Sequence, residues 1–293
     1  MKTSLRQLQV FVLTARHQNI SIAAQEACIS QAAASMSLSQ FEKMLGEALF
    51  DRKSKRLVLN SLGKQLLPKA HSILQQMTEL EQLAAHSEMV AGNLHIGAST
   101  TIANYVLPNI VNEFWQAYPQ TNLQLSALNT EKCIEQLLNF EIDIALIEGM
   151  YIHPKIQLIP WKKDKLVLFC HPQHPLLQKK TVDLPTLAEY PWILREPESG
   201  TRHVLESALQ QSKLNLMNIT LVNSSQAIKN IIKTNSNAIS CLSEVIVHDD
   251  IQHKKLVPLS VKALKLERYF YHAYYTESKT SKLAELFIKF IEA

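Results

Sequence analysis

The first sixty residues constrain the fold most tightly, because three short helical patterns follow one another there. Apolar residues recur three or four positions apart from Leu5 to Ala15, which predicts one apolar face on a first helix. A second short helix is predicted from Ser21. A third is predicted between Ser30, a favourable N-cap, and Gly46, a favourable C-terminal stop. The last two helices, joined by a short turn, predict a helix-turn-helix.

The outward face of the predicted third helix combines small and polar side chains. It carries Gln31, Ala32, Ser35, Met36 and Ser39. Such a face can approach the floor of the DNA major groove, where a glutamine can pair with adenine. An ordinary solvated helix face would permit the same residues, so the neighbouring sequence has to separate the two interpretations.

A basic cluster follows the third helix in a segment that predicts a hairpin wing. Its cations are Arg52, Lys53, Lys55 and Arg56. Residues 1 to 64 hold nine Lys or Arg and four Asp or Glu, a net charge of +5, although the whole chain carries +4. A basic wing beside such a helix places cations at phosphates or in the minor groove while the helix contacts bases. The charge pattern therefore favours nucleic-acid binding.

The same segment carries a family resemblance. LysR-type transcriptional regulators have a winged helix-turn-helix that resembles the run SIAAQEACISQAAASMSLSQFEKMLGEALFDRKSKRLVLN, with S-x-A-A, S-Q-x-A-x-S, F-E-x-x-L-G and L-F-x-R in register. The resemblance implies DNA contacts by Gln31, Ser35 and Arg52, with Ala32 and Met36 on the same face. The sequence departs from the family pattern at Ala32, where Pro is common, and at Met36, where Arg or Gln is common.

Residues 61 to 92 predict a long connecting helix. Its apolar positions alternate three and four residues apart, as in a coiled-coil seam formed by Leu66, Ala70, Ile73, Met77, Leu80 and Ala84. Pro68 is expected to kink this helix near its beginning. Packing within a globular domain is the alternative, but the polar flanks favour a dimer helix. LysR-type regulators pair in this way, so the resemblance implies a homodimer, and further a homotetramer, on promoter DNA.

After Gly92 the pattern changes to alternating strands and helices. Strands are predicted at 93–98, 122–127 and 142–147, an order that favours a mostly parallel sheet. A second set of strands begins at Lys165. The chain is expected to cross between the two sets twice, near residues 161 to 168 and 262 to 270, which resembles a periplasmic binding-protein fold.

The predicted fold class is thus α plus α/β, with three parts. They are a winged helix-turn-helix DNA-binding domain at 1–60, a dimerisation helix at 61–92 and a two-lobe effector domain at 93–293. Lobe I is expected at 93–164 and 265–293, and lobe II at 165–264.

Ligands in such sheets bind at the carboxyl ends of the strands, in the cleft between the lobes. The polar residues that follow these strand ends are, in lobe I, Ser99, Thr100, Thr101, Asn129 and Glu148, and in lobe II, Arg195, Glu196, Ser199, Gly200, Thr201, Arg202, Ser224 and Ser225. Helix starts at Thr100 and Ser199 would aim backbone N–H groups into the cleft. For any single hydroxyl, capping of its own helix is the simpler role. The convergence of several favours a small anionic effector.

The segment W-I-L-R-E-P-E-S-G-T-R refines the resemblance. Together with G-A-S-T-T-I-A-N-Y-V-L-P and D-I-A-L-I-E-G, it is similar to a branch containing activators of sulfite reductase and sulfur assimilation operons, sulfite-responsive regulators and carbon-fixation operon regulators. That similarity implies either a small anion, such as sulfite, or a phosphorylated metabolite as the effector. Glu198 replaces a Gly of the branch pattern, and Asn235 to Asn237 replace a Gly-rich turn.

The two arginines of this segment have different expected partners. Arg202 is expected either to point at the ligand or to pair with Glu198 or Glu206. Arg195, at the strand end beside Glu196, is expected either to bind the ligand or to hold the lobes together.

Other classes of protein fit the sequence less well. An enzyme needs a nucleophile with a base, paired carboxylates or a metal cluster, and the sequence offers none of these, so we expect no catalysis, cofactor or metal. The best metal candidate, Cys170-His-Pro-Gln-His174, lacks a third ligand. A solute receptor would need export, yet we expect a cytoplasmic protein because no signal peptide or apolar membrane run is visible. A thiol switch is disfavoured because residues 195 to 212 contain no Cys.

Overall fold

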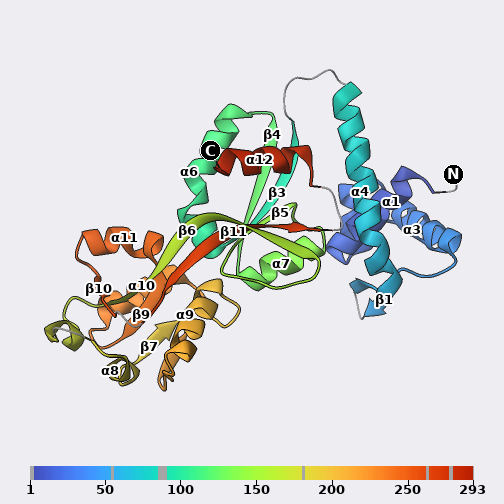
Figure 1. Ribbon diagram of the computed structural model, residues 1–293. Helices are drawn as coiled ribbons and strands as arrows, with labels where there is room; N and C mark the ends of the chain where they lie inside the picture. Colours follow the sequence, from blue (N-terminus) through green and yellow to red (C-terminus); the bar gives the residue numbers. More distant parts are fainter. Residues whose placement is uncertain are drawn as a thin grey trace.

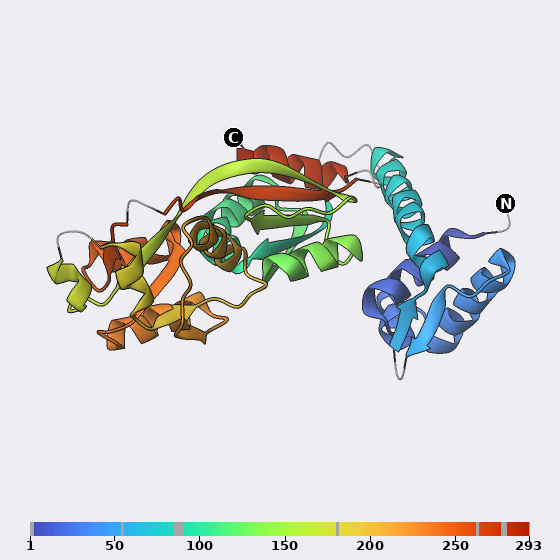
Figure 2. The same ribbon diagram turned by 60° about the horizontal axis from the view of Figure 1, so that its bottom comes forward.

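The computed structural model describes residues 3–53, 56–84, 91–179, 182–261, 264–276 and 280–292. A helical N-terminal domain carries a two-stranded hairpin, and a long helix connects it to two α/β lobes (Figures 1 and 2). The elements of this first part are α1 (Leu5–His17), α2 (Ile20–Glu26), α3 (Gln31–Leu45), β1 (Phe50–Lys53), β2 (Arg56–Leu59) and α4 (Ser61–Ala84).

The predicted boundaries of the third helix are confirmed in α3. The Ser30 hydroxyl accepts a hydrogen bond from the Ala33 N–H at 3.2 Å, and Gly46 has a left-handed φ of 82° directly after the helix. The second helix begins one residue earlier than predicted, because the Asn19 side chain caps it by accepting from the Ser21 N–H at 2.8 Å.

The buried face of α1 lies further along the helix than the spacing predicted. Leu5 is 41% exposed, whereas all residues from Val10 to Ala15 are buried. This middle part is surrounded because α2, α3 and α4 all pack against α1. The Phe11 ring lies at its centre, 5.6 Å from the ring of Phe41 and 5.7 Å from that of Phe50.

The predicted seam of α4 divides between two environments. Ala70 is buried against the N-terminal domain, while Ile73 and Leu80 are 46% and 59% exposed. Pro68 stands inside the helix, which continues through it. The side chain of Ala84 lies outside the described residues. An apolar stripe therefore remains on the outer face of α4.

The two lobes share one mixed sheet. Its strands and the helices around it are β3 (Gly92–Ser99), α5 (Thr100–Tyr105), α6 (Leu107–Ala117), β4 (Thr121–Leu128), α7 (Thr130–Leu138), β5 (Ile144–Glu148), β6 (Ile156–Cys170), η1 (Pro175–Gln178), α8 (Leu184–Ala188), β7 (Trp192–Leu194), α9 (Gly200–Gln211), β8 (Ile219–Leu221), α10 (Ser225–Thr234), β9 (Ile239–Ser243), α11 (Glu244–Gln252), β10 (Val257–Leu259), β11 (Glu267–Tyr275) and α12 (Lys282–Glu292).

The strand order is β4-β3-β5-β11-β6-β9-β7-β8, with β10 paired to β6. β3 runs parallel to β4 and β5, and β7 runs parallel to β8 and β9. β11 runs antiparallel to both β5 and β6. The sheet is therefore mixed rather than mostly parallel, because the two long strands that cross between the lobes run in opposite directions (Figure 1).

The first crossing strand is longer than predicted, since β6 begins at Ile156 rather than at Lys165. Pro160 lies within it, and its ladder with β11 shifts register between Phe270 and Tyr271. The irregularity interrupts the period of two by which strands are identified. The short strand β10 was also not predicted.

Each lobe has its own apolar core. Lobe I is built around Phe114, Phe270 and Phe287, and lobe II around Trp192 and Phe169. A third cluster joins the core of the N-terminal domain to the face of lobe I that carries α7. Among the described helices, none combines the length and apolarity needed to cross a bilayer.

Candidate DNA-binding surface and effector cleft

The first candidate site is the outer face of α3. The predicted contact residues are all exposed on it: Gln31, Ala32, Ser35, Met36 and Ser39. The opposite face buries Ala34, Leu38 and Phe41 in the core of the N-terminal domain. Burial of one face thus fixes which side chains α3 presents outward, and Met36, 64% exposed, is more exposed than the other large apolar side chains of the helix, Met44 and Leu45.

The predicted hairpin is formed by β1 and β2, and β2 packs against α1 and α4. Arg52 pairs with Leu57 across the hairpin, and the Leu57 N–H donates to the Gln18 carbonyl at 2.9 Å, which fixes the wing to the end of α1. Arg52 and Arg56 are exposed. The side chain of Lys53 and all of Lys55 lie outside the described residues.

The second candidate site is the cleft between the lobes, where strand ends meet helix starts. Several hydroxyl and amide side chains there cap their own helices. Ser99 caps α5, Asn129 caps α7 and Ser224 caps α10, each accepting a hydrogen bond from a backbone N–H. Of these three, Ser224 is exposed. For these residues the simpler alternative, helix capping, describes the structure.

Arg195 joins the two lobes. Its Nη1 donates to Thr100 Oγ1 at 3.0 Å in lobe I and to Ser225 Oγ at 3.1 Å in lobe II. Its Nε and Nη2 each donate to one Glu196 oxygen at 2.7 Å. Arg195 is only 2% exposed, so this guanidinium is committed to protein partners. We call this group, Arg195 with Thr100, Ser225 and Glu196, the inter-lobe clasp.

Arg202 has a different environment from Arg195. Its Nε donates to Glu206 Oε1 at 2.7 Å, one turn further along α9. Among the described residues its Nη1 has no hydrogen-bond partner. Of the two acidic partners expected from the sequence, Glu198 and Glu206, Arg202 thus pairs with Glu206, on its own helix.

A buried ion network that sequence reasoning missed links residues of both lobes. Arg268 on β11 donates to Asp164 Oδ2 at 2.6 Å and lies 3.0 Å from Glu148 Oε2. Thr201 Oγ1 donates to Glu148 Oε1 at 3.1 Å and accepts from Arg268 Nη1 at 3.1 Å. Ser243 completes the network by donating to Asp164 Oδ1 at 2.6 Å. Glu148 and Thr201 are thereby brought together, as the cleft hypothesis requires.

The sequence did contain a signal for Arg268. In β11 it falls between exposed Glu267 and Tyr269, in the same phase as buried Phe270. A charged residue in the inward phase of a strand needs a partner inside the protein.

The start of α9 presses against lobe I. A Cβ on Gly200 would lie 2.1 Å from the Glu148 carbonyl oxygen and 2.8 Å from Thr130 Oγ1, so only glycine fits there. Ser199 occupies the N-cap position of α9, yet its hydroxyl makes no capping bond. Ser199, Thr130 and Thr101 are 0%, 3% and 0% exposed, and their hydroxyls have no hydrogen-bond partner within the described part of the chain.

An open vestibule of about 610 Å³ lies outside this contact. Thr100, Asn129, Asn223, Arg195 and Lys132 line it together with four carboxylates, Glu131, Glu135, Glu196 and Glu198. Since Glu196 already neutralises Arg195, the vestibule is acidic overall.

Comparison with known proteins assigns both parts of the chain to one family. Residues 5–64 match the bacterial regulatory helix-turn-helix protein, lysR family, and residues 87–293 match the LysR substrate binding domain. This chain belongs to the LysR family of transcriptional regulators. The regulator is 34% identical to the HTH-type transcriptional regulator YeiE of Escherichia coli (strain K12), covering 100% of this chain and 98% of that protein.

Further relatives agree with this assignment. The RuBisCO operon transcriptional regulator of Allochromatium vinosum is 28% identical, covering 99% of this chain and 96% of its own. A full-length OxyR variant from Pseudomonas aeruginosa superposes with a TM-score of 0.80 at 20% identity, covering 99% of this chain and 95% of its own. The family consists of DNA-binding regulators rather than enzymes, and its members bind effectors and oligomerise.

Three of the four thiols of this regulator, Cys133, Cys170 and Cys241, are buried. Burial raises the pKa of Cys170 and of Cys241 to about 12, and it raises the pKa of Cys133 as well. Cys28 is exposed. A buried thiol of raised pKa holds little thiolate, the reactive form. Near Cys170, the His174 ring caps η1 by accepting from the Leu176 N–H at 3.1 Å.

Proposed function

We propose that this LysR-family regulator binds a small oxyanion, with sulfite as the first candidate, between Ser199 and Thr130. The observation that carries the proposal is the Ser199 hydroxyl, fully buried at the start of a 12-residue helix and without a capping bond. The N-terminus of a helix attracts an anion through its free N–H groups and its dipole. Thr130, at the start of α7 in lobe I, lies against Gly200, the residue after Ser199, so the two helix starts would have to part there to admit the anion.

Size and charge favour a small anion over a phosphorylated metabolite. The inner hydroxyls are almost completely buried, which suits a ligand of a few atoms. A phosphate ester carries about two negative charges near neutral pH. It would have to bind beside Glu131, Glu135 and Glu198, and Arg195 is already neutralised by Glu196. A phosphorylated metabolite is the alternative effector, in keeping with the resemblance to regulators of carbon-fixation operons.

We further propose that α3 enters the major groove and that the wing contacts the DNA backbone. Gln31 and Ser35 would contact base edges, with Ala32, Met36 and Ser39 completing the face. Arg52 and Arg56, together with Lys53 and Lys55, would neutralise phosphates. The exposed stripe with Ile73 and Leu80 on α4 supports pairing of two chains there, since a monomer would leave it in water. Pairs of such dimers would form the tetramer.

The proposed effector site is tested by the melting temperature of the purified full-length chain. Sulfite, sulfate, thiosulfate, phosphate and a phosphoglycerate are added separately. A ligand at about 100 times its Kd stabilises a folded protein by about 2.7 kcal/mol. Sulfite is expected to raise Tm in the wild type and in Ser224→Ala, which removes an exposed capping hydroxyl, but not in Ser199→Ala.

Three outcomes contradict the proposal. Stabilisation by the phosphoglycerate alone would assign the cleft to the alternative effector. An unchanged Tm with every anion, or an equal sulfite effect in Ser199→Ala, would remove the anion site from Ser199.

A further inference from the structure

One helix, α7, extends from the effector cleft to the N-terminal domain. Its first residue is Thr130, whose hydroxyl faces Gly200, and its C-terminal turn leads directly into Phe140. With nine residues it is about 13 Å long. Cys133, Ile134 and Leu137 bury one face of α7 against the sheet of lobe I. A short, well-packed helix moves as a rigid body, so a displacement at one end reaches the other.

The far end of α7 is held in an unusual backbone conformation. Phe140 has a φ of +56°, in the left-handed region that glycine ordinarily occupies after a helix. Such a conformation in a residue with a Cβ costs about 1 kcal/mol or more, and it persists only where the surroundings stabilise it.

The Phe140 ring packs on Tyr275 of β11, 4.9 Å away, and Phe140 also contacts two other parts of the chain. Its ring lies 4.6 Å from the imidazole of His71 on α4, and its carbonyl accepts a hydrogen bond from Arg16 Nε on α1 at 3.3 Å. Arg16 also pairs with Glu26 on α2 at 3.3 Å. The end of α7 therefore contacts the linker helix through the ring and the helix-turn-helix through the carbonyl. We call the contact of Phe140 with His71 and Arg16 the junction.

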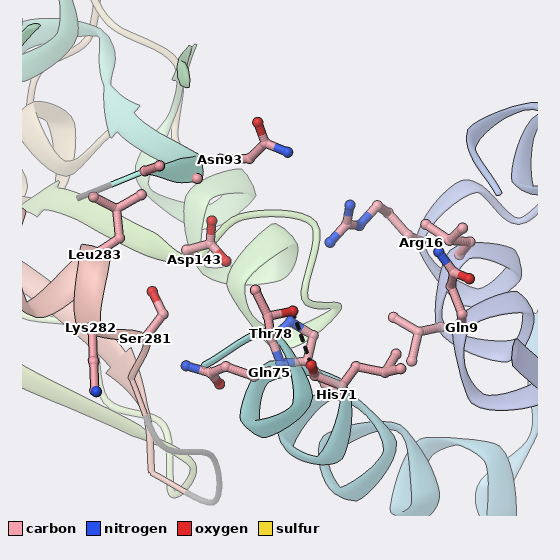
Figure 3. Close-up of a pocket in the computed structure, with 15 residues that line it drawn as sticks. Gln9, Arg16, His71, Gln75, Thr78, Asn93, Asp143, Ser281, Lys282 and Leu283 are labelled. Atoms are coloured by element: carbon pink, nitrogen blue, oxygen red, sulfur yellow. Dashed lines mark hydrogen bonds between the residues drawn. The ribbon is translucent and has the colours of Figure 1, made fainter. Parts of the chain in front are cut away.

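The junction borders a cavity of about 260 Å³ (Figure 3). Arg16 reaches into it from α1, His71 and Gln75 line it on α4, and Asp143 stands on the wall that belongs to lobe I. Closely packed interiors resist displacement, whereas a void beside a contact leaves room for it. A rotation of the N-terminal domain at the junction thus finds room on the side of this cavity, while the apolar cluster that joins the domain to lobe I shifts with it.

We infer that α7 transmits the state of the effector cleft to the DNA-binding domain, with Phe140 as the positioning residue at its far end. The inference rests on the proposed effector site for the signal that moves α7 in the cell. In outline, an anion between Ser199 and Thr130 displaces the start of α7. Phe140 then shifts against His71 and Arg16, and the recognition helix changes its angle to the operator.

A mutant cycle tests the inference without an effector. Gly200→Ala places a Cβ 2.1 Å from the Glu148 carbonyl oxygen, 2.7 Å from Glu148 Cγ and 2.8 Å from Thr130 Oγ1, which forces the start of α9 away from the end of β5 and the start of α7. Phe140→Gly removes the ring at the other end and tolerates the positive φ. DNA affinity and footprint are measured for the full-length wild type, both single variants and the double variant. Melting curves establish that each is folded.

Gly200→Ala is expected to change the affinity for operator DNA by about fivefold or more, a typical coupling, and to alter the footprint. In the Phe140→Gly background the same substitution is expected to change the affinity for operator DNA by less than about twofold. Phe290→Ala is the matched control, because Phe290 packs on Phe114 and Tyr118 in lobe I, away from the junction. In that background the effect of Gly200→Ala should persist. If Gly200→Ala does not fold, Thr130→Leu enlarges the other side of the same contact.

Equal effects of Gly200→Ala with and without the Phe140 ring would overturn the inference. The absence of any effect of Gly200→Ala and of Thr130→Leu on DNA binding in the wild-type background would also overturn it. Failure of the effector proposal is recognised separately, since no anion would then raise the Tm of the wild type, and the cycle would still decide the role of α7.

Discussion

The two arginines that flank the start of α9 are predicted to differ greatly in their contribution to stability. Arg195 forms the inter-lobe clasp and is 2% exposed, whereas Arg202 pairs only with Glu206, whose side chain is 42% exposed. The perturbation is substitution by Met in each case, which keeps the aliphatic stem and removes the guanidinium.

The magnitude follows from the contacts that each arginine makes. Breaking a buried ion pair by removing one partner costs about 3 to 5 kcal/mol, because the remaining charge is left without compensation. Glu196 is 17% exposed and regains some water, so we expect about 3 kcal/mol for Arg195→Met. A half-exposed pair one helical turn apart contributes about 0.5 kcal/mol, so Arg202→Met should be nearly neutral.

The assay is thermal unfolding followed by calorimetry on the full-length chain. In a domain of about 200 residues, 1 kcal/mol corresponds to about 2 to 4 °C. Arg195→Met is therefore expected to lower the Tm of the effector domain by about 6 to 12 °C, and Arg202→Met by less than about 2 °C. Combining Arg195→Met with Thr100→Ala should cost less than the sum of the two, since they share a hydrogen bond. Equal losses in the two Arg variants, or strict additivity with Thr100→Ala, would refute the assignment of the clasp.

Three further predictions address other parts of the chain. Arg52→Ala should weaken binding to all DNA sequences alike and lower the slope of log affinity against log salt by about 1. Gln31→Ala should instead reduce discrimination between bases. Identical losses of affinity from both variants, regardless of sequence, would exclude Gln31 from base contact. An alkylating reagent at mildly basic pH should modify Cys28 alone, as mass spectrometry would show, and rapid modification of Cys170 in folded protein would contradict its burial. Burial lowers the pKa of His71, so the unfolded chain binds a proton there more readily than the folded one, and stability should fall as the pH drops through about 6.5 and below it. His71→Gln should flatten that loss in melting curves, and an unchanged pH dependence would exclude His71 as its source.

Local sequence signals were sufficient for the N-terminal domain. The cap at Ser30, the stop at Gly46 and the period of α3 are properties of adjacent residues, so they could be recognised without the rest of the chain. The buried middle of α1 could not, because its burial depends on three other helices arriving around it. Leu5 had the right period and still remained exposed.

The cleft shows where local reasoning ends. Arg195 and Arg202 have similar neighbours in sequence, yet one is bound by Thr100 and Ser225 and the other by Glu206. Thr100 is far from Arg195 along the chain and is brought close only by the sheet. The strand ends that form the cleft were predictable from topology, whereas the partner of each side chain depended on distances that only the folded chain supplies.

The path of the chain through lobe II has a practical consequence. It enters along β6 and leaves along β11, and these strands pair along their length, so lobe II is a single continuous insertion with adjacent ends. Ser199, Arg195 and Ser225 all belong to it. Lobe II could therefore be transplanted between family members as a cassette, with both joints made in one ladder of paired strands. A chimaera of this kind would exchange the lobe II residues of the proposed effector site and leave α3, α4 and α7 untouched.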